Sequence, residues 1–298
     1  MADELKLPFG YSALPERSKW RWPNAAGLAA WVVINIEHFE FGKFGTAIQP
    51  HLTSQPEIAN YAWRDYGNRV GIWRLFDLFD RYPEVKETVA LNADICRYYP
   101  QIVEAALARN WEIMGHGLNN STGLAGLDET TERHRLTESL SIIQATTGQL
   151  PRGWLSPGFS VTTRTPDLLR QAGVRYLADW VNDDQPYFIK TQAGSLVAVP
   201  YTLEANDITL CLSNRFSGPE FSQAVCDQFD QLLTDSAEVS RVFVLGLHPF
   251  IVGQPLRLRY LAEILQYLSE VAVQQVWFST GYQIADYFAK LHGESLDS

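Results

Sequence analysis

The sequence predicts an α/β fold in which a mostly parallel sheet closes into a distorted (β/α) barrel of about seven strands. Short apolar stretches with strand character alternate with amphipathic stretches along the whole chain, and this alternation is typical of parallel strands joined by right-handed crossovers. No linker, low-complexity tract or repeat divides the sequence. We therefore expect one domain over residues 28–298, preceded by an N-terminal arm over residues 1–27.

The arm is irregular and rich in proline and tryptophan. Residues 20–23 hold two tryptophans and a proline, and exposing so much apolar surface to water is unfavourable. We therefore expect this segment to pack over the barrel or against a neighbouring subunit. Because packing against a subunit is one of these options, we expect a homo-oligomer.

Leu28–Ile36 is the first strand in the prediction, because its continuous apolar, β-branched run suits a strand buried on both faces. A long loop is expected before the first helix. The remaining strands are predicted over residues 88–91, 111–114, 153–155, 174–178, 196–200, 242–247 and 276–279. The helices are predicted over residues 70–79, 100–109, 127–147, 165–172, 221–233, 258–271 and 282–289. Thr165 followed by Pro166 is a typical helix start.

Composition excludes several classes of function. The 298 residues carry a formal net charge of −10, so no basic stripe is available to bind nucleic acid. No apolar run reaches the length of a membrane span, and the first ten residues lack the pattern of a signal peptide. Cys96, Cys211 and Cys226 are too few and too far apart for a disulfide framework or a thiolate metal site. These features predict a cytoplasmic protein with no membrane partner.

Polar residues follow the predicted strands, where the mouth of a barrel carries its site. His116 stands out because it lies between two glycines directly after a strand. The residues at the strand ends are Glu37, His38, Asp94, His116, Asn120, Ser156, Asp179, Asp183 and His248. Carboxylates and imidazoles supply bases, acids and possible metal ligands. Each position also has a structural interpretation: the acids of residues 179–184 suit turns, and His38 suits a solvated loop.

Four stretches carry a family resemblance over almost the whole chain: INIEHFEFG, GHGLNNS, PRGWLSPGFSVTTRTPDLLRQAGVRYLAD, and LGLHPFIVGQPLRLRYLAEIL with VWFSTGYQIADYF. They resemble the motifs of polysaccharide deacetylases with the NodB-like domain. The phrasing is closer to the branch of the metal-independent allantoinase analogue and of intracellular peptidoglycan-deacetylase-like proteins than to secreted chitin deacetylases. The resemblance implies the same distorted (β/α) barrel.

The sequence departs from the family pattern at the expected metal site. Asn120 stands where the resemblance places the second metal histidine, and His38 stands where it places the second acid. Glu37, His38 and His116 are the remaining possible metal ligands, but successive strand residues point to opposite sides unless a bulge intervenes. We therefore expect no cofactor, with zinc or another divalent metal as the alternative.

The resemblance implies hydrolysis of a carbon–nitrogen bond other than a peptide bond by activated water. Its catalytic residues would be Glu37 as base, His248 as acid, and Asp179 as a second base or as a group that orients a histidine. The residues expected to bind the substrate are His116, Asn120, Trp154, Ser156, Trp180 and Tyr201. The substrate would be a small amide, a ureide or an N-acetyl sugar. The alternative is a catalytically degraded deacetylase-fold protein that binds a small amide or carbohydrate ligand.

Overall fold

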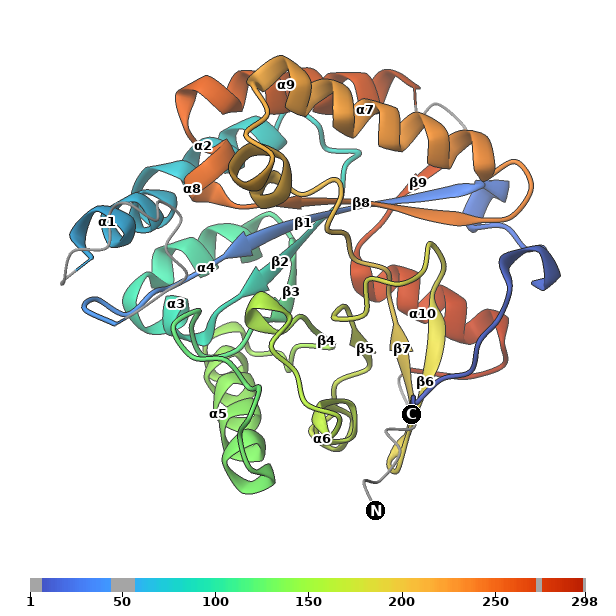
Figure 1. Ribbon diagram of the computed structural model, residues 1–298, viewed down its shortest axis with the longest axis horizontal. Helices are drawn as coiled ribbons and strands as arrows, with labels where there is room; N and C mark the ends of the chain where they lie inside the picture. The colour runs from blue at the N-terminus through green and yellow to red at the C-terminus, as the bar shows by residue number, and fades with distance from the viewer. Residues whose placement is uncertain (1–6, 44–56, 272–274, 297–298) are drawn as a thin grey trace.

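The computed structural model describes residues 7–43, 57–271 and 275–296. One sheet runs through the molecule in the strand order β6-β7-β5-β4-β3-β2-β1-β8, and β9 pairs with β1 beside β2 (Figure 1). The strands are β1 (Leu28–Ile36), β2 (Glu87–Leu91), β3 (Glu112–Gly115), β4 (Gly153–Trp154), β5 (Tyr176–Leu177), β6 (Tyr187–Thr191), β7 (Gly194–Ala198), β8 (Arg241–Leu247) and β9 (Val276–Phe278). All pairs are parallel except β6 with β7.

Helices cover the sheet between successive strands (Figure 1). They are α1 (Ile58–Tyr66), α2 (Ile72–Phe79), α3 (Ala93–Tyr98), α4 (Pro100–Ala108), α5 (Glu129–Thr147), α6 (Thr165–Gln171), α7 (Gly218–Asp235), α8 (Pro249–Val252), α9 (Pro255–Val271) and α10 (Gly281–Leu291). Two wider helical turns, η3 (Gly67–Gly71) and η5 (Ile208–Ser213), and three short turns, η1 (Leu14–Glu16), η2 (Pro23–Ala25) and η4 (Pro157–Phe159), complete the described elements. In that part of the chain, no helix combines the length and apolarity that crossing a membrane requires.

The predicted fold class is confirmed: the sheet curls into an incomplete barrel. The predicted strand over Leu28–Ile36 matches β1 residue for residue. Three features were not predicted. The strand β6 forms an antiparallel hairpin with β7 across a tight turn, α1 occupies part of the expected loop, and the short helices α3 and α8 follow two strand ends directly.

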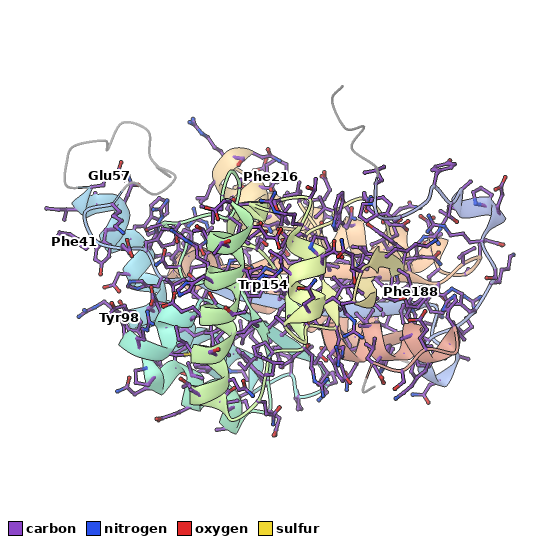
Figure 2. All side chains as sticks on the ribbon, turned by 90° about the horizontal axis from the view of Figure 1, so that it is seen from below. Phe41, Glu57, Tyr98, Trp154, Phe188 and Phe216 are labelled. Carbon is purple, nitrogen blue, oxygen red and sulfur yellow. The ribbon has the colours of Figure 1, made fainter. Side chains whose placement is uncertain are left out.

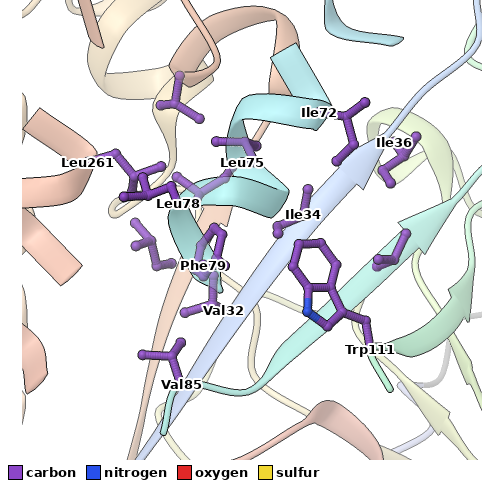
Figure 3. Close-up of a cluster of buried hydrophobic side chains, with 14 of the residues drawn as sticks. Val32, Ile34, Ile36, Ile72, Leu75, Leu78, Phe79, Val85, Trp111 and Leu261 are labelled. Carbon is purple, nitrogen blue, oxygen red and sulfur yellow. The ribbon is translucent and has the colours of Figure 1, made fainter. Parts of the chain in front are cut away.

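The main hydrophobic cluster fixes the strand that ends at the site. Figure 3 shows α2 packed against β1, with Ile72 near Ile34 and Ile36. Trp111 belongs to the same cluster, where its ring lies 4.9 Å from that of Phe76 in α2. These side chains are buried. Burial of this much apolar surface holds the end of β1, and therefore the residue that follows it, in one position.

The N-terminal arm packs against the barrel, as predicted. Trp22 is only 1% exposed and its Nε1 donates to the carbonyl oxygen of Arg241 at the start of β8, over 2.8 Å. At its other end, the carbonyl oxygen of Pro8 accepts a hydrogen bond from the backbone nitrogen of Lys190 in β6. Since β6 and β8 are the two ends of the sheet path, the arm spans the seam between them.

Candidate active site

A cavity of about 560 Å³ opens at the carboxyl ends of the parallel strands. Its lining includes Glu37, His116 and His248, which directly follow β1, β3 and β8. The cavity has the size of a site for a small molecule. Barrel sites lie beyond the strand ends, and on that basis the sequence predicted that these three side chains lie together.

The Glu37 carboxylate lies between the two histidines. Its Oε1 is 3.5 Å from Nε2 of His116 and 3.7 Å from Nε2 of His248. Burial alone would raise the pKa of Glu37, but the charge of His248 and the contacts with His116 outweigh burial and lower the pKa below its ordinary value. The carboxylate is therefore held in its ionised form, in which it can accept a proton.

His248 is backed by a buried carboxylate. Asp207 accepts from Nδ1 of His248 at 2.6 Å and from its backbone nitrogen at 2.7 Å. Burial would lower the pKa of His248, but the attraction of Asp207 and Glu37 outweighs it and raises the pKa above its ordinary value. Because Nδ1 donates to Asp207, Nε2 is the nitrogen that faces the cavity and can give a proton away.

His116 is oriented differently. Its Nδ1 lies 2.7 Å from the carbonyl oxygen of Leu155, and because a carbonyl can only accept, the proton sits on Nδ1. Among the described residues, the buried Nε2 has no hydrogen-bond partner. It faces Glu37, so this nitrogen is available to a molecule in the cavity.

Asn120 presents an amide nitrogen to the carboxylate. Its Nδ2 donates to Oε1 of Glu37 at 2.5 Å, while its Oδ1 accepts from Nδ2 of Asn92 at 2.9 Å. The Asn92 amide also donates to the carbonyl oxygen of His116. This chain of bonds fixes which end of the Asn120 amide points toward Glu37, and that end is a donor.

The side chains here do not match an ordinary zinc site. Asn120 offers a donor where a ligand needs a lone pair, and the ring of His38 stacks on Tyr98 at 4.8 Å and lies outside the cavity lining. Of the three candidate ligands, only Glu37 and His116 therefore share the cavity. Across the described ranges, no group of three or more His, Cys, Asp or Glu side chains could hold a metal ion.

The other predicted residues are divided between the cavity and its support. Ser156 and Tyr201 line the cavity. Asp179 is not among the lining residues; it accepts from the backbone nitrogen and the hydroxyl of Ser156, at 2.6 and 3.0 Å. Burial raises the pKa of Asp179 to about 7. Asp179 therefore contacts Ser156 of the cavity lining and does not line the cavity itself.

Trp154 and Trp180 do not form walls of the cavity. Trp154 is fully buried in the hydrophobic core, where its ring lies against Gly115 and its Nε1 donates to Oγ of Ser156. Trp180 packs edge-on against Phe9 of the arm, with ring centroids 4.9 Å apart. Both tryptophans fill space between elements, which is the usual role of aromatic residues near strand ends.

Three polar residues of the site escape the sequence analysis. Asp207 directly precedes η5, and Asn35 lies inside β1, where its Nδ2 donates to the hydroxyl of Tyr201 at 3.0 Å. Arg64 comes from α1, in a stretch read as loop. A polar residue within the apolar run of β1 was a usable signal for Asn35, because buried polar groups need partners. Asp207 and Arg64 gave no comparable signal.

Comparison with known proteins finds a family match within the chain. Residues 61–177 match the polysaccharide deacetylase family. The chain carries a polysaccharide deacetylase domain. A Schizosaccharomyces pombe protein assigned to the polysaccharide deacetylases is 26% identical over 302 residues, covering 91% of this chain and 93% of that protein.

Solved structures extend the likeness of the deacetylase domain to the whole barrel. The PuuE allantoinase structure has a TM-score of 0.82 at 27% identity, covering 92% of this chain and 94% of that one. A Pseudomonas aeruginosa protein assigned to the polysaccharide deacetylases has a TM-score of 0.81 at 29% identity, covering 91% and 94%. The predicted family and the predicted class of reaction, hydrolysis of non-peptide carbon–nitrogen bonds, are confirmed by these comparisons.

Proposed function

We propose that this protein hydrolyses a carbon–nitrogen bond in a small amide, a ureide or an N-acetyl sugar, with Glu37 as the base and His248 as the acid. The observation that carries the proposal is the placement of one ionised carboxylate within 3.7 Å of two buried imidazole Nε2 atoms. The opposite pKa shifts of Glu37 and His248 support these roles, since a base must be ionised and an acid protonated at the same pH.

The reaction uses both groups in sequence. Glu37 takes a proton from water while the water oxygen bonds to the carbonyl carbon. Nε2 of His248 then gives its proton to the leaving nitrogen as the carbon–nitrogen bond breaks. An acid and an amine, or for a ureide the corresponding carbamoyl products, leave the cavity. The proton on Glu37 returns to His248 across the gap between them, which restores both groups.

The remaining residues position the substrate in this proposal. The amide of Asn120 and Nε2 of His116 face the space beside Glu37, where they meet polar atoms of the substrate. Asp179 acts as a positioning residue, because it fixes Ser156 in the cavity wall. Tyr201, held by Asn35, forms part of the opposite lining.

Purified protein assayed against simple ureides and N-acetyl sugars tests the function, with metal content measured on the same sample and with and without chelator. We expect hydrolysis that survives the chelator. A Glu37→Gln variant should lose at least about 100-fold in kcat, since general base catalysis contributes on this order. Binding of such compounds without turnover by the native chain would instead establish the alternative, a degraded deacetylase-fold protein that retains a ligand site.

A homo-oligomer and a cytoplasmic location also belong to this proposal. The exposed apolar side chains of Phe41 and Ile58 support self-association, and light scattering of the purified protein would test it. The three free cysteines support a reducing compartment. Fluorescence microscopy of a tagged chain would test the location.

A further inference from the structure

Arg64 forms part of the wall of the same cavity. It extends from α1, and the guanidinium Cζ lies 3.9 Å above the centroid of the Phe39 ring. The residue is only 6% exposed, and both Arg64 and Glu37 line the cavity. In Figure 2, Glu57 and Phe41 mark the end of the molecule to which α1 belongs. The Phe39 ring therefore covers one face of this guanidinium, and the N–H groups along its edge can donate to a ligand.

The guanidinium has no acceptor in the described part of the chain. Among the described residues, no carboxylate forms an ion pair or a hydrogen bond with it, and the buried Nε makes no hydrogen bond. Glu37 and Glu57 act on it only through longer-range attraction, which does not make up for desolvation, so burial lowers the pKa of Arg64. Every other buried charge of the site has a direct partner: Glu37 is bound by Asn120 and His248 by Asp207.

A buried guanidinium without an acceptor is unfavourable, and this cost is relieved when an acceptor arrives with a ligand. The planar fork of arginine matches a carboxylate, which it binds through two parallel hydrogen bonds. A neutral N-acetyl sugar offers no group that matches both the charge and the geometry. Attraction to Glu37 alone would leave the guanidinium nitrogens unbonded.

We propose that Arg64 binds a carboxylate of the substrate, so that the substrate is a small acidic amide or ureide whose carboxylate lies a few bonds from the carbon–nitrogen bond that is hydrolysed. The reaction in this statement rests on the proposed function, whereas binding of the acidic ligand does not. Arg64 thereby determines specificity, while Glu37 and His248 carry out the chemistry.

A pair of ligands without a carbon–nitrogen bond tests the binding step separately. The acid is 4-oxopentanoate, in which a methylene replaces the nitrogen of N-acetylglycine, and the neutral partner is 5-hydroxypentan-2-one. Calorimetric titration of the native chain should show that the acid binds more tightly. Arg64→Gln should weaken binding of the acid by about 10- to 100-fold, the usual effect of losing a charge-assisted hydrogen bond, and should leave the neutral ligand unchanged.

Two further variants make the test specific. Arg64→Lys keeps the charge but loses the fork, so binding of 4-oxopentanoate should fall between that of the native chain and that of Arg64→Gln. Arg69→Gln is the matched control, because the Arg69 side chain is 73% exposed and lies 3.9 Å from Asp65; it should bind the acid like the native chain. Circular dichroism confirms that each variant is folded. Equal binding of the two ligands, or unchanged binding in both Arg64 variants, would overturn the inference.

Turnover separates this inference from the proposed function. We expect N-acetylglycine to be hydrolysed with a higher kcat/KM than N-acetylglycinamide. Hydrolysis of the neutral amide as fast as the acid would overturn the role of Arg64 and leave the proposed function in place. Tight, Arg64-dependent binding of 4-oxopentanoate in a chain that hydrolyses neither compound would overturn the proposed function and support the binding role of Arg64.

Discussion

At the scale of single residues, Glu37 and His248 are two titratable groups whose surroundings move their pKa values apart. The pKa of Glu37 lies below its ordinary 4.5 and that of His248 above its ordinary 6.5. Both groups therefore hold the proton states that hydrolysis needs over the whole interval between those values. Asp207 is essential to this arrangement, because it supplies the negative charge that keeps a fully buried imidazole protonated.

The pH dependence of kcat/KM follows from these shifts. The rate should fall on the acid side only below about pH 4.5, as Glu37 becomes protonated, and on the alkaline side only above about pH 6.5, as His248 loses its proton. Asp207→Asn should move the alkaline limb toward lower pH and leave the acid limb in place. A pH–rate profile of both chains measures this, and an alkaline limb at the same pH in the variant would contradict the role of Asp207.

Sequence reasoning reached the residues whose position depends on local structure. Glu37, His116 and His248 each directly follow an apolar strand, and parallel strands deliver their ends to one mouth. Asp207 and Arg64 reach the same cavity from irregular or misassigned segments, so only the tertiary fold brings them there. His38 shows the opposite error, since it adjoins Glu37 in sequence but turns to Tyr98. Adjacent residues at a strand end diverge unless the backbone bulges.

At the scale of elements, His248, the proposed acid, is held by a close contact between two helical segments. Gly71 ends η3, and its Cα faces the backbone of Pro249, the first residue of α8, so that a Cβ at Gly71 would overlap the Pro249 carbonyl oxygen. His248 immediately precedes this proline. From the same turn, Nδ2 of Asn68 donates to the carbonyl oxygen of Glu37 at 2.8 Å. The turn η3 thus fixes the backbone beside both Glu37 and His248.

Gly71→Ala should therefore impair both stability and catalysis. Overpacking of a tight contact costs about 1–3 kcal/mol, and any shift of α8 displaces His248 from Glu37. We expect a lower melting temperature and a lower kcat. Gly10→Ala is the matched control, because a Cβ there would meet no atom within 4 Å. Native-like kcat in a folded Gly71→Ala variant would show that this contact does not position the acid.

The helix α1 and the strand β6 were not predicted because neither has a clear local sequence pattern. The helix α1 spans only Ile58–Tyr66 and continues through the wide turn η3 into α2, so its own apolar pattern is short. Among the described residues, β6 pairs with β7 and the arm, while the other strand pairs are parallel. Its prediction would have required the tertiary arrangement of the sheet, which local sequence patterns do not contain.

At the scale of the whole molecule, the arm joins the two ends of an incomplete barrel. Trp22 packs against both Trp277 and Tyr287, and Arg17 forms an ion pair with Asp183 at 2.6 Å. The loops beside β8 close the rest of the seam, where the carbonyl oxygen of Asp184 accepts from the backbone nitrogen of Val242. The barrel is therefore completed by loops and the arm, together with an isolated parallel bridge between Asn206 and Gly246 of β8.

Loss of the arm should lower the stability of the barrel. Trp22→Ala removes a buried indole and its hydrogen bond, at a cost of about 3–5 kcal/mol, and deletion of residues 1–23 should cost at least as much. Tyr11→Ala serves as the control within the arm, because Tyr11 is 96% exposed. Thermal unfolding of the three variants measures the difference. Equal melting temperatures for the native and truncated chains would refute the structural role of the arm.

The hydrogen bond between Lys190 and Pro8 has a consequence for the behaviour of the protein in concentrated solution. The strand β6 is the last in the sheet path, and an uncovered edge strand is a template on which a second chain can add a strand. The arm occupies that edge through the carbonyl oxygen of Pro8, while the proline nitrogen carries no hydrogen with which to extend the pairing. Truncated chains would therefore aggregate edge to edge, whereas the arm ends the sheet in the intact protein.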